Sequence, residues 1–166
     1  MAANITAAQS SVDDIVLAAA LAVIKAKRIR HRGADAGYAS LYDLNKVLAK
    51  LEEIYEKEKT KKLLPLRFVE YSYGPYSPDL ERVLEELAAK GLADYVVKVH
   101  VPGAPTRGVD EDYAWLIIEH QLSERDADRK YVKKLFKPRK KPRLPRELEE
   151  MIARAVNSYI EAAARE

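Results

Sequence analysis

The strongest constraint on the fold lies in residues 71–95, where signals for a strand, a turn, a helix and a second strand follow one another. Gly74 and Pro75 favour a turn, because glycine adopts backbone angles that other residues resist and proline fixes the next one. Ser77 then offers a helix N-cap with a proline at the first helical position. Gly91 is the expected C-cap, and the buried face of the helix between them is expected to hold Leu80, Val83, Leu84 and Leu87.

Two helices are expected before this unit. Ser11 and Asp14 form a capping-box-like start for the first helix, whose centre is apolar nearly all round and which should end before Gly33. Its basic end suits the helix dipole, so capping is the favoured interpretation over ligand binding for Lys25, Lys27, Arg28, Arg30 and Arg32.

The second expected helix begins at Ser40 and Asp43, which repeat the capping arrangement. Apolar residues from Leu41 to Tyr55 follow helical spacing and predict one buried face. The other face and the exit mix both signs of charge, which indicates a solvated surface made of Glu52, Glu53, Glu56, Lys57, Glu58, Lys59, Lys61 and Lys62.

Strands are expected at 66–73, 95–101 and 113–120, the last two forming a hairpin around the loop 102–112. Helix, helix, strand, helix and hairpin is the order of a winged helix-turn-helix. The expected fold class is therefore α+β and helix-rich, with an additional basic segment and a C-terminal helix. The predicted divisions are a flexible N-terminus at 1–10, a winged-helix-like domain at 11–122, a basic connecting segment at 123–146 and a C-terminal amphipathic helix at 147–166.

The run Tyr71-Ser-Tyr-Gly-Pro-Tyr-Ser-Pro-Asp-Leu80, followed by Gly91-Leu92, resembles the YwgA-like and Panacea-type (SocA-like antitoxin) families of prokaryotes. These families carry a similar aromatic-Gly-Pro-aromatic-Ser step into a helix. The resemblance implies a small intracellular regulatory or toxin-neutralising domain with no catalytic residues to transfer. The residues that carry the structural motif are Gly74, Pro75, Tyr76, Ser77 and Gly91.

Composition excludes several kinds of chemistry. The chain has no cysteine, so it can hold no disulfide, no thiolate metal site and no cysteine nucleophile. Few Asn and Gln beside dense Lys, Arg and Glu match the usage of hyperthermophile proteins, which favours a hot archaeal or bacterial origin. The longest apolar run, Ile15 to Ile24, is too short to cross a membrane, and the charges around it do not fit a secretory signal. A cytoplasmic protein is expected.

The most unusual stretch lies between Arg129 and Arg146, where ten residues are Lys or Arg and none is acidic. Because the whole chain has a formal net charge of +3, the remainder sums to 3 − 10 = −7, so the basicity is local. Such a run predicts sequence-tolerant, salt-dependent nucleic-acid binding, with DNA favoured; the alternative is a solvated tether. The predicted nucleic-acid-binding residues are Arg129, Lys130, Lys133, Lys134, Lys137, Arg139, Lys140, Lys141, Arg143 and Arg146.

The helix that a winged-helix protein places in the DNA groove is a poorer candidate for this contact. Its exposed side is expected to carry four acids and two bases, which phosphates would repel: Asp79, Glu81, Arg82, Glu85, Glu86 and Lys90. A rival function is therefore a protein-interaction module, such as an antitoxin or an assembly subunit. The last helix has an apolar stripe that could pair in a homodimer or pack on its own domain, formed by Leu148, Met151, Ile152, Ala155, Tyr159 and Ala162.

An enzyme is the least favoured interpretation. His100 and His120 could face each other across the hairpin beside Glu119. However, consecutive strand residues point to opposite faces, so the three side chains cannot converge. No catalytic residue, metal site or cofactor is expected. The sequence predicts a non-catalytic, nucleic-acid-associated regulator that resembles DNA-binding transcription regulators, acting as a homodimer through its C-terminal helix.

Overall fold

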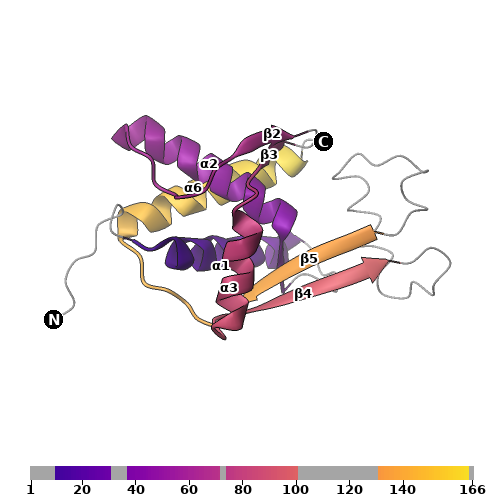
Figure 1. The fold of residues 1–166 in the computed structure, drawn as a ribbon. Helices are drawn as coiled ribbons and strands as arrows, with labels where there is room; N and C mark the ends of the chain where they lie inside the picture. Colours follow the sequence, from indigo (N-terminus) through magenta and orange to yellow (C-terminus); the bar gives the residue numbers. More distant parts are fainter. Residues whose placement is uncertain (1–9, 31–36, 72–73, 101–130, 165–166) are drawn as a thin grey trace.

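The computed structural model describes residues 10–30, 37–71, 74–100 and 131–164. These residues form an α+β fold that is rich in helix (Figure 1). In chain order the elements are α1 (Val12–Arg30), β1 (Ala39–Ser40), α2 (Leu41–Lys59), β2 (Val69–Tyr71), β3 (Gly74–Tyr76), α3 (Leu80–Ala89), β4 (Ala93–His100), β5 (Tyr131–Pro138) and α6 (Arg146–Ala164).

Both expected helix starts are confirmed. The Asp14 backbone N–H donates to the Ser11 hydroxyl at 3.2 Å and begins α1. At the start of α2 the capping box is complete, because the Asp43 N–H donates to Ser40 Oγ at 3.0 Å and the Ser40 N–H donates to Asp43 Oδ2 at 2.9 Å. These bonds satisfy backbone donors that a helix leaves without an intrahelical acceptor.

Glu52 was expected on the solvated face of α2, and this prediction is wrong. Its side chain is buried, and its two carboxylate oxygens accept hydrogen bonds from the backbone N–H groups of Leu63 and Leu64, each at 2.8 Å. The chain that follows α2 folds back over the helix, so Glu52 lies beneath it. Helical spacing carries no information about a partner eleven or twelve positions away.

The Gly74–Pro75 step is part of a strand and not the turn itself. β2 and β3 pair antiparallel, with Tyr71 opposite Gly74, so the connection between them falls on residues 72–73, outside the described part of the chain. Gly74 has φ +112°, a conformation that side-chain-bearing residues rarely adopt. The strand expected over 66–73 is shorter, at Val69–Tyr71.

The predicted start of α3 at Ser77 is also wrong. The helix begins at Leu80 with Asp79 as its N-cap residue, and no side chain caps it. Ser77 instead makes a turn before the helix, since its hydroxyl accepts from the Asp79 N–H at 3.3 Å. Its own N–H donates to Asn45 Oδ1 on α2 at 2.8 Å, which anchors the turn to the neighbouring helix.

The end of α3 confirms the C-cap prediction. Gly91 has φ +75°, and the N–H groups of Gly91 and Leu92 donate to the carbonyls of Ala88 and Leu87, each at 3.0 Å. This pair of bonds is a Schellman motif, which requires a left-handed residue at the glycine position. The chain then enters β4 directly.

The larger sheet has the strand order β1-β5-β4, with both pairs antiparallel. β5 pairs with β4 along its whole length, from Ala93 opposite Pro138 to His100 opposite Tyr131. Residues 131–138 of the predicted basic connecting segment therefore form a central strand and not a connection. Leu135 and Phe136 are both buried, so the strand lacks the alternation that marks a half-buried one. The predicted loop 102–112 and strand 113–120 lie outside the described residues.

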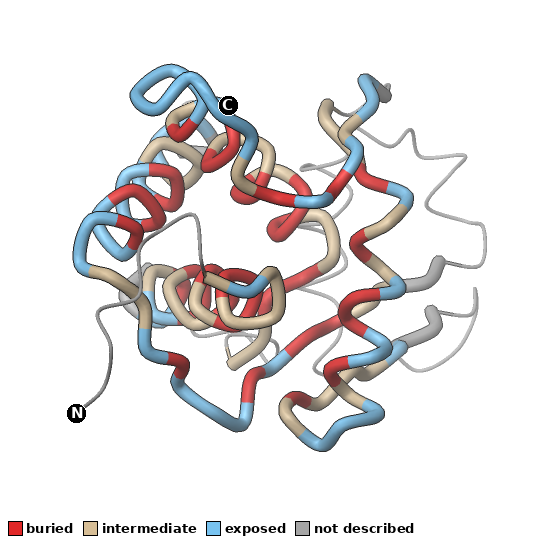
Figure 2. Tube along the Cα trace, turned by 60° about the vertical axis from the view of Figure 1, so that its left-hand side comes forward, coloured by how far each residue is buried: buried red, intermediate tan, exposed pale blue. Residues whose placement is uncertain are grey.

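α6 packs against α1 and α2. Its apolar stripe, led by Leu148, Met151 and Ala155, is buried in the core of the same chain, and Figure 2 shows buried residues along the facing sides of the helices. Most of the stripe is thus used within the chain, while Tyr159 is half-buried and Ala162 is exposed. A homodimer through this helix stays a prediction. Within the described ranges, no helix has both the length and the apolar character needed to cross a membrane.

Candidate nucleic-acid interface

Folding divides the predicted basic residues into groups. Arg129 and Lys130 lie outside the described part of the chain. Lys133 lies half-buried on β5. Three others form ion pairs with carboxylates: Lys134 with Glu81, Arg139 with Asp94 and Arg146 with Glu150. The remaining four are exposed and have no carboxylate partner among the described residues: Lys137, Lys140, Lys141 and Arg143.

Lys134 has a structural role. Its ammonium group contacts Glu81 on α3, and both side chains are about one-third exposed or less. Glu81 also accepts from the Tyr95 hydroxyl at 3.4 Å, so the carboxylate joins α3 to both β4 and β5. Burial raises the pKa of Tyr95, and the nearby Glu81 charge raises it further. Lys134 is therefore engaged inside the fold and is a poor phosphate ligand.

Arg139 forms an exposed pair. Its guanidinium lies 2.6 Å from Asp94 Oδ1 through Nη2, and Nε donates to the same oxygen at 2.9 Å. The hydrogen bond and the charge of Asp94 raise the pKa of Arg139. Exposed pairs of this kind contribute little to stability, so a phosphate could compete for this guanidinium.

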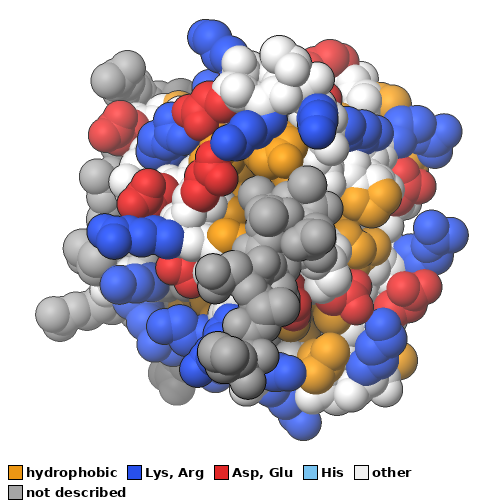
Figure 3. Space-filling view, turned by 90° about the vertical axis from the view of Figure 1, so that its left-hand side faces the viewer, with side chains coloured by type: hydrophobic (Ala, Val, Ile, Leu, Met, Phe, Trp, Pro, Cys, Tyr) orange, Lys and Arg blue, Asp and Glu red, His pale blue; other side chains and the backbone are white. Residues whose placement is uncertain are grey.

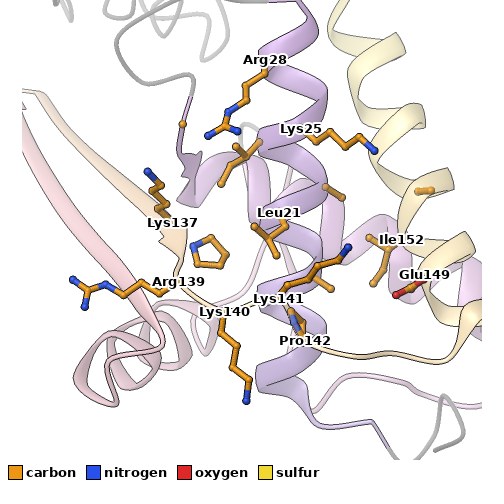
Figure 4. A pocket seen from close by; sticks show the side chains of 16 residues that line it. Leu21, Lys25, Arg28, Lys137, Arg139, Lys140, Lys141, Pro142, Glu149 and Ile152 are labelled. Carbon is orange, nitrogen blue, oxygen red and sulfur yellow. The ribbon is translucent and has the colours of Figure 1, made fainter. Parts of the chain in front are cut away.

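The segment 137–142 forms one wall of a cleft of about 860 Å³ that it shares with α1 and α6. Figure 4 shows Arg28 and Lys137 on one side of Leu21, and Lys141 and Pro142 on the other. We call five of the lining residues the cationic rim: Lys25, Arg28, Lys137, Lys140 and Lys141. None of the five has a carboxylate within salt-bridge distance among the residues that the structure describes. Glu149 is the only acid among the described lining residues.

The sequence left two roles open for the basic residues at the end of α1, namely helix capping and ligand binding. Lys25 and Arg28 are exposed and line the cleft, which favours ligand binding for these two. Lys27 is buried and forms an ion pair with Asp43. No side-chain position is described for Arg30, and Arg32 lies outside the described residues.

The pair of Lys27 and Asp43 belongs to a buried cluster that the sequence did not predict. Tyr159 on α6 donates to Asp43 Oδ1 at 2.6 Å, while Asp43 Oδ2 contacts Lys27 on α1. Burial alone would raise the pKa of Asp43, but the charge of Lys27 and the hydrogen bonds to the carboxylate outweigh it and hold the pKa below its usual value. The capping pattern at Ser40 predicted the hydrogen bonds of Asp43 within the cap, but not its contacts with Lys27 and Tyr159.

Elsewhere on the surface, some cations are paired with carboxylates. At the end of the molecule that faces the viewer in Figure 3, blue and red side chains are interspersed, with hydrophobic groups between them. Ion pairs join α2 and α6, including Lys59 with Glu147 at 2.5 Å and Arg154 with Glu58 at 2.7 Å. These pairs neutralise part of the positive charge at this end, whereas none of the five cations of the cationic rim has a carboxylate partner in the described structure.

The outer face of α3 is less acidic than predicted. Asp79 is half-buried and accepts from the Arg67 N–H at 2.9 Å, and Glu81 is engaged with Lys134. The exposed residues are two bases and two acids, Arg82, Lys90, Glu85 and Glu86. Lys90 is itself paired with Asp13 at 3.1 Å. This face therefore has no excess of positive charge to offer a phosphate.

Within the described residues, no group of three or more His, Asp or Glu side chains could hold a metal ion. The predicted trio cannot be placed, because Glu119 and His120 lie outside the described residues and no side-chain position is described for His100.

Comparison of the chain with protein-family models, curated proteins and solved structures finds no match. The resemblance to the YwgA-like and Panacea-type families, carried by residues 71–92, stays a prediction.

Proposed function

We propose that this protein is a winged-helix regulator that associates with nucleic acid through the cationic rim. The observation that carries the proposal is the gathering of Lys25, Arg28, Lys137, Lys140 and Lys141 around one cleft, with no carboxylate partner in the described structure. Unpaired surface cations of this density are costly unless an anion neutralises them. The phosphate backbone of nucleic acid is an anion that needs no sequence-specific reader.

The arrangement of the elements supports the winged-helix part of the proposal. Leaving aside β2 and β3, the order is α1, β1, α2, α3, β4 and β5, and the sheet order is β1-β5-β4. That order, with the final strand at the centre, is typical of winged helices. α2 and α3 would then be the helix-turn-helix pair, separated here by the β2–β3 hairpin, and α6 would be an addition that completes the core.

Phosphate contact has a measurable signature. Each phosphate neutralised releases counterions, so the logarithm of affinity falls linearly with the logarithm of salt concentration. Five contacts predict a slope of about −4.5 on duplex DNA and about −3.5 on a single strand. Between about 50 and 200 mM salt, the duplex affinity would fall about 500-fold.

The experiment compares two variants that each remove three positive charges. Binding of the full chain to random-sequence duplex and single-stranded DNA and RNA of about 20 nucleotides is measured by fluorescence anisotropy from about 50 to 300 mM NaCl. The test variant replaces Lys137, Lys140 and Lys141 by Gln, and should reduce the duplex slope by about 2.7. The control replaces by Gln three exposed lysines in and just after the last turn of α2: Lys57, Lys61 and Lys62.

Equal slopes for the test and control variants would refute the assignment of the cationic rim, and absence of salt-dependent binding by the unmodified chain would refute the function.

A protein-interaction module is the second candidate. It is favoured by the outer face of α3, whose mixed charge suits a protein partner better than a phosphate, and by the exposed Val97 on β4. Co-purification of a stoichiometric partner that survives about 1 M salt would support it.

A further inference from the structure

The cleft has an apolar floor that phosphate contacts leave unused. Phosphate groups need only the charged ends of the cationic rim, yet the surface between these ends is aliphatic. It is formed by Ala18, Leu21, Ala22, Pro138, Pro142 and Ile152. An apolar surface enclosed within a charged rim fits a ligand that has both characters.

We propose that this cleft binds a small amphiphilic organic anion, with its aliphatic body on the floor and a carboxylate or phosphate head at the cationic rim. Because the ligand and nucleic acid would use the same cations, binding of one would exclude the other. This regulatory consequence rests on the function proposed above, whereas the ligand site itself does not.

Size and shape support a small molecule. A volume of about 860 Å³ falls within the range of about 300–1,000 Å³ found for ligand sites, and the cleft is concave where a duplex is convex. Unpaired bases are a weaker fit, because no described lining residue is aromatic and base recognition relies on stacking against rings.

The charges are arranged for a head group at the edge of the floor. In Figure 4, Arg28 and Lys137 come from different elements and lie on the side of Leu21 away from Lys141, while Lys140 and Arg139 extend away from the floor. Arg28 lies beside Gly37, the residue next to Tyr38. Lys137 also lies over the Tyr38 ring, 5.7 Å from its centroid, which restrains its side chain. An arginine can hold a carboxylate or phosphate through two parallel hydrogen bonds, so Arg28 is the expected anchor.

The test uses octanoate, octyl phosphate, hexanoate and 1-octanol, titrated into the full chain by isothermal calorimetry. Each buried methylene is worth about a fourfold gain in affinity, so octanoate, with two more methylenes, should bind about fifteenfold more tightly than hexanoate. The neutral alcohol should bind far more weakly than either eight-carbon anion, and inorganic phosphate should bind more weakly still. Equal affinity for inorganic phosphate and octyl phosphate would overturn the proposal, because the floor would then contribute nothing.

A pair of matched substitutions on α6 locates the site. Ala153 is exposed and lines the cleft, whereas Ala162 is exposed further along the same helix. Ala153→Glu places a negative charge on the α6 wall of the cleft, which repels an anionic ligand and should weaken octanoate binding about tenfold. Ala162 does not line the cleft, so Ala162→Glu should leave octanoate binding unchanged. Equal effects of the two variants would overturn the location, and circular dichroism verifies that both are folded.

Competition separates this proposal from the general function. Octanoate that binds but does not displace DNA would overturn the regulatory consequence alone. DNA binding with the predicted salt slope, together with no octanoate binding, would overturn the ligand site and leave the proposed function standing. Octanoate binding without any nucleic-acid binding would overturn the proposed function and leave the ligand site standing.

Discussion

The buried cluster around Asp43 gives the sharpest test of what holds the helices together. Asp43 is fully buried, and its carboxylate accepts from Tyr159 on α6 at 2.6 Å and from the Ser40 N–H at 2.9 Å. Lys27 on α1 supplies the neutralising charge. One carboxylate therefore joins α1, α2 and α6. Removing its cation should cost far more than removing an ordinary surface lysine.

The perturbation is Lys27→Met, which keeps most of the side-chain volume and removes the charge. A buried pair that loses one partner leaves an uncompensated charge, and the free energy of unfolding should fall by about 3–5 kcal/mol. Lys25→Met is the matched control on the same helix, because Lys25 is exposed, and it should change stability by less than about 0.5 kcal/mol. The assay is urea unfolding at pH 7, followed by far-UV circular dichroism and compared at constant m-value.

The pH dependence supplies an independent check. In the natural chain the pKa of Asp43 is lowered in the folded state. Its contribution to stability is thus present above the unfolded-state pKa of about 3.9 and is lost as pH falls through the folded value. In Lys27→Met, burial is no longer opposed by that charge, so the folded pKa of Asp43 rises and protonation stabilises the variant. The stability deficit should therefore narrow as pH falls from 7 towards about 4.

Two results would refute this reasoning. A deficit no larger than that of Lys25→Met would mean that the Lys27 charge contributes nothing net to the fold. A large deficit that stays constant with pH would mean that lost packing, and not the charge on Asp43, is responsible.

Three further predictions follow from single contacts. Glu52→Gln should lower the free energy of unfolding by about 1–3 kcal/mol, since one backbone N–H loses its buried acceptor. In urea unfolding, the control Glu53→Gln on the exposed face should be as stable as the unmodified chain. An equal loss of stability for both variants would contradict the role of Glu52. Gly91→Ala should cost about 1–2 kcal/mol, because φ +75° strains a residue with a Cβ; an unchanged thermal midpoint would contradict it. Lys134→Gln should change the salt slope of DNA binding less than Lys141→Gln, because Lys134 is already paired; the opposite order in anisotropy titrations would show that the pair opens on binding.

The sequence predicted correctly the features whose partners lie within four or five residues. The capping box of Ser40 and Asp43 and the Schellman motif at Gly91 are of this kind, because their hydrogen bonds are local and a few residue types dominate them. The sequence predicts the start of α3 at Ser77, but this residue lies in a turn before the helix, and its N–H donates to Asn45, 32 positions away. No local pattern contains such a bond.

The same difference between near and distant partners explains why the sequence did not predict the central strand of the sheet. The sequence predicts a connection at residues 131–138 because they belong to the run between Arg129 and Arg146 that holds ten bases and no acid. In the fold they pair with β4 on one side and β1 on the other, and Leu135 and Phe136 are buried. A strand in which consecutive residues are both buried shows no alternation of apolar and polar residues. It is therefore recognised only from the strands with which it pairs.

The candidate site shows why a charge count along the chain is an incomplete guide to binding. The ten bases between Arg129 and Arg146, with no acid among them, look equivalent in sequence. Folding, however, places acidic partners beside Lys134, Arg139 and Arg146. It leaves Lys137, Lys140 and Lys141 without one in the described structure, and α1 adds two cations that lie more than 100 positions earlier. A phosphate must displace a carboxylate in the first group and only water in the second. Variants with equal charge changes in the two groups should therefore differ in affinity, and that difference measures the contribution of the fold.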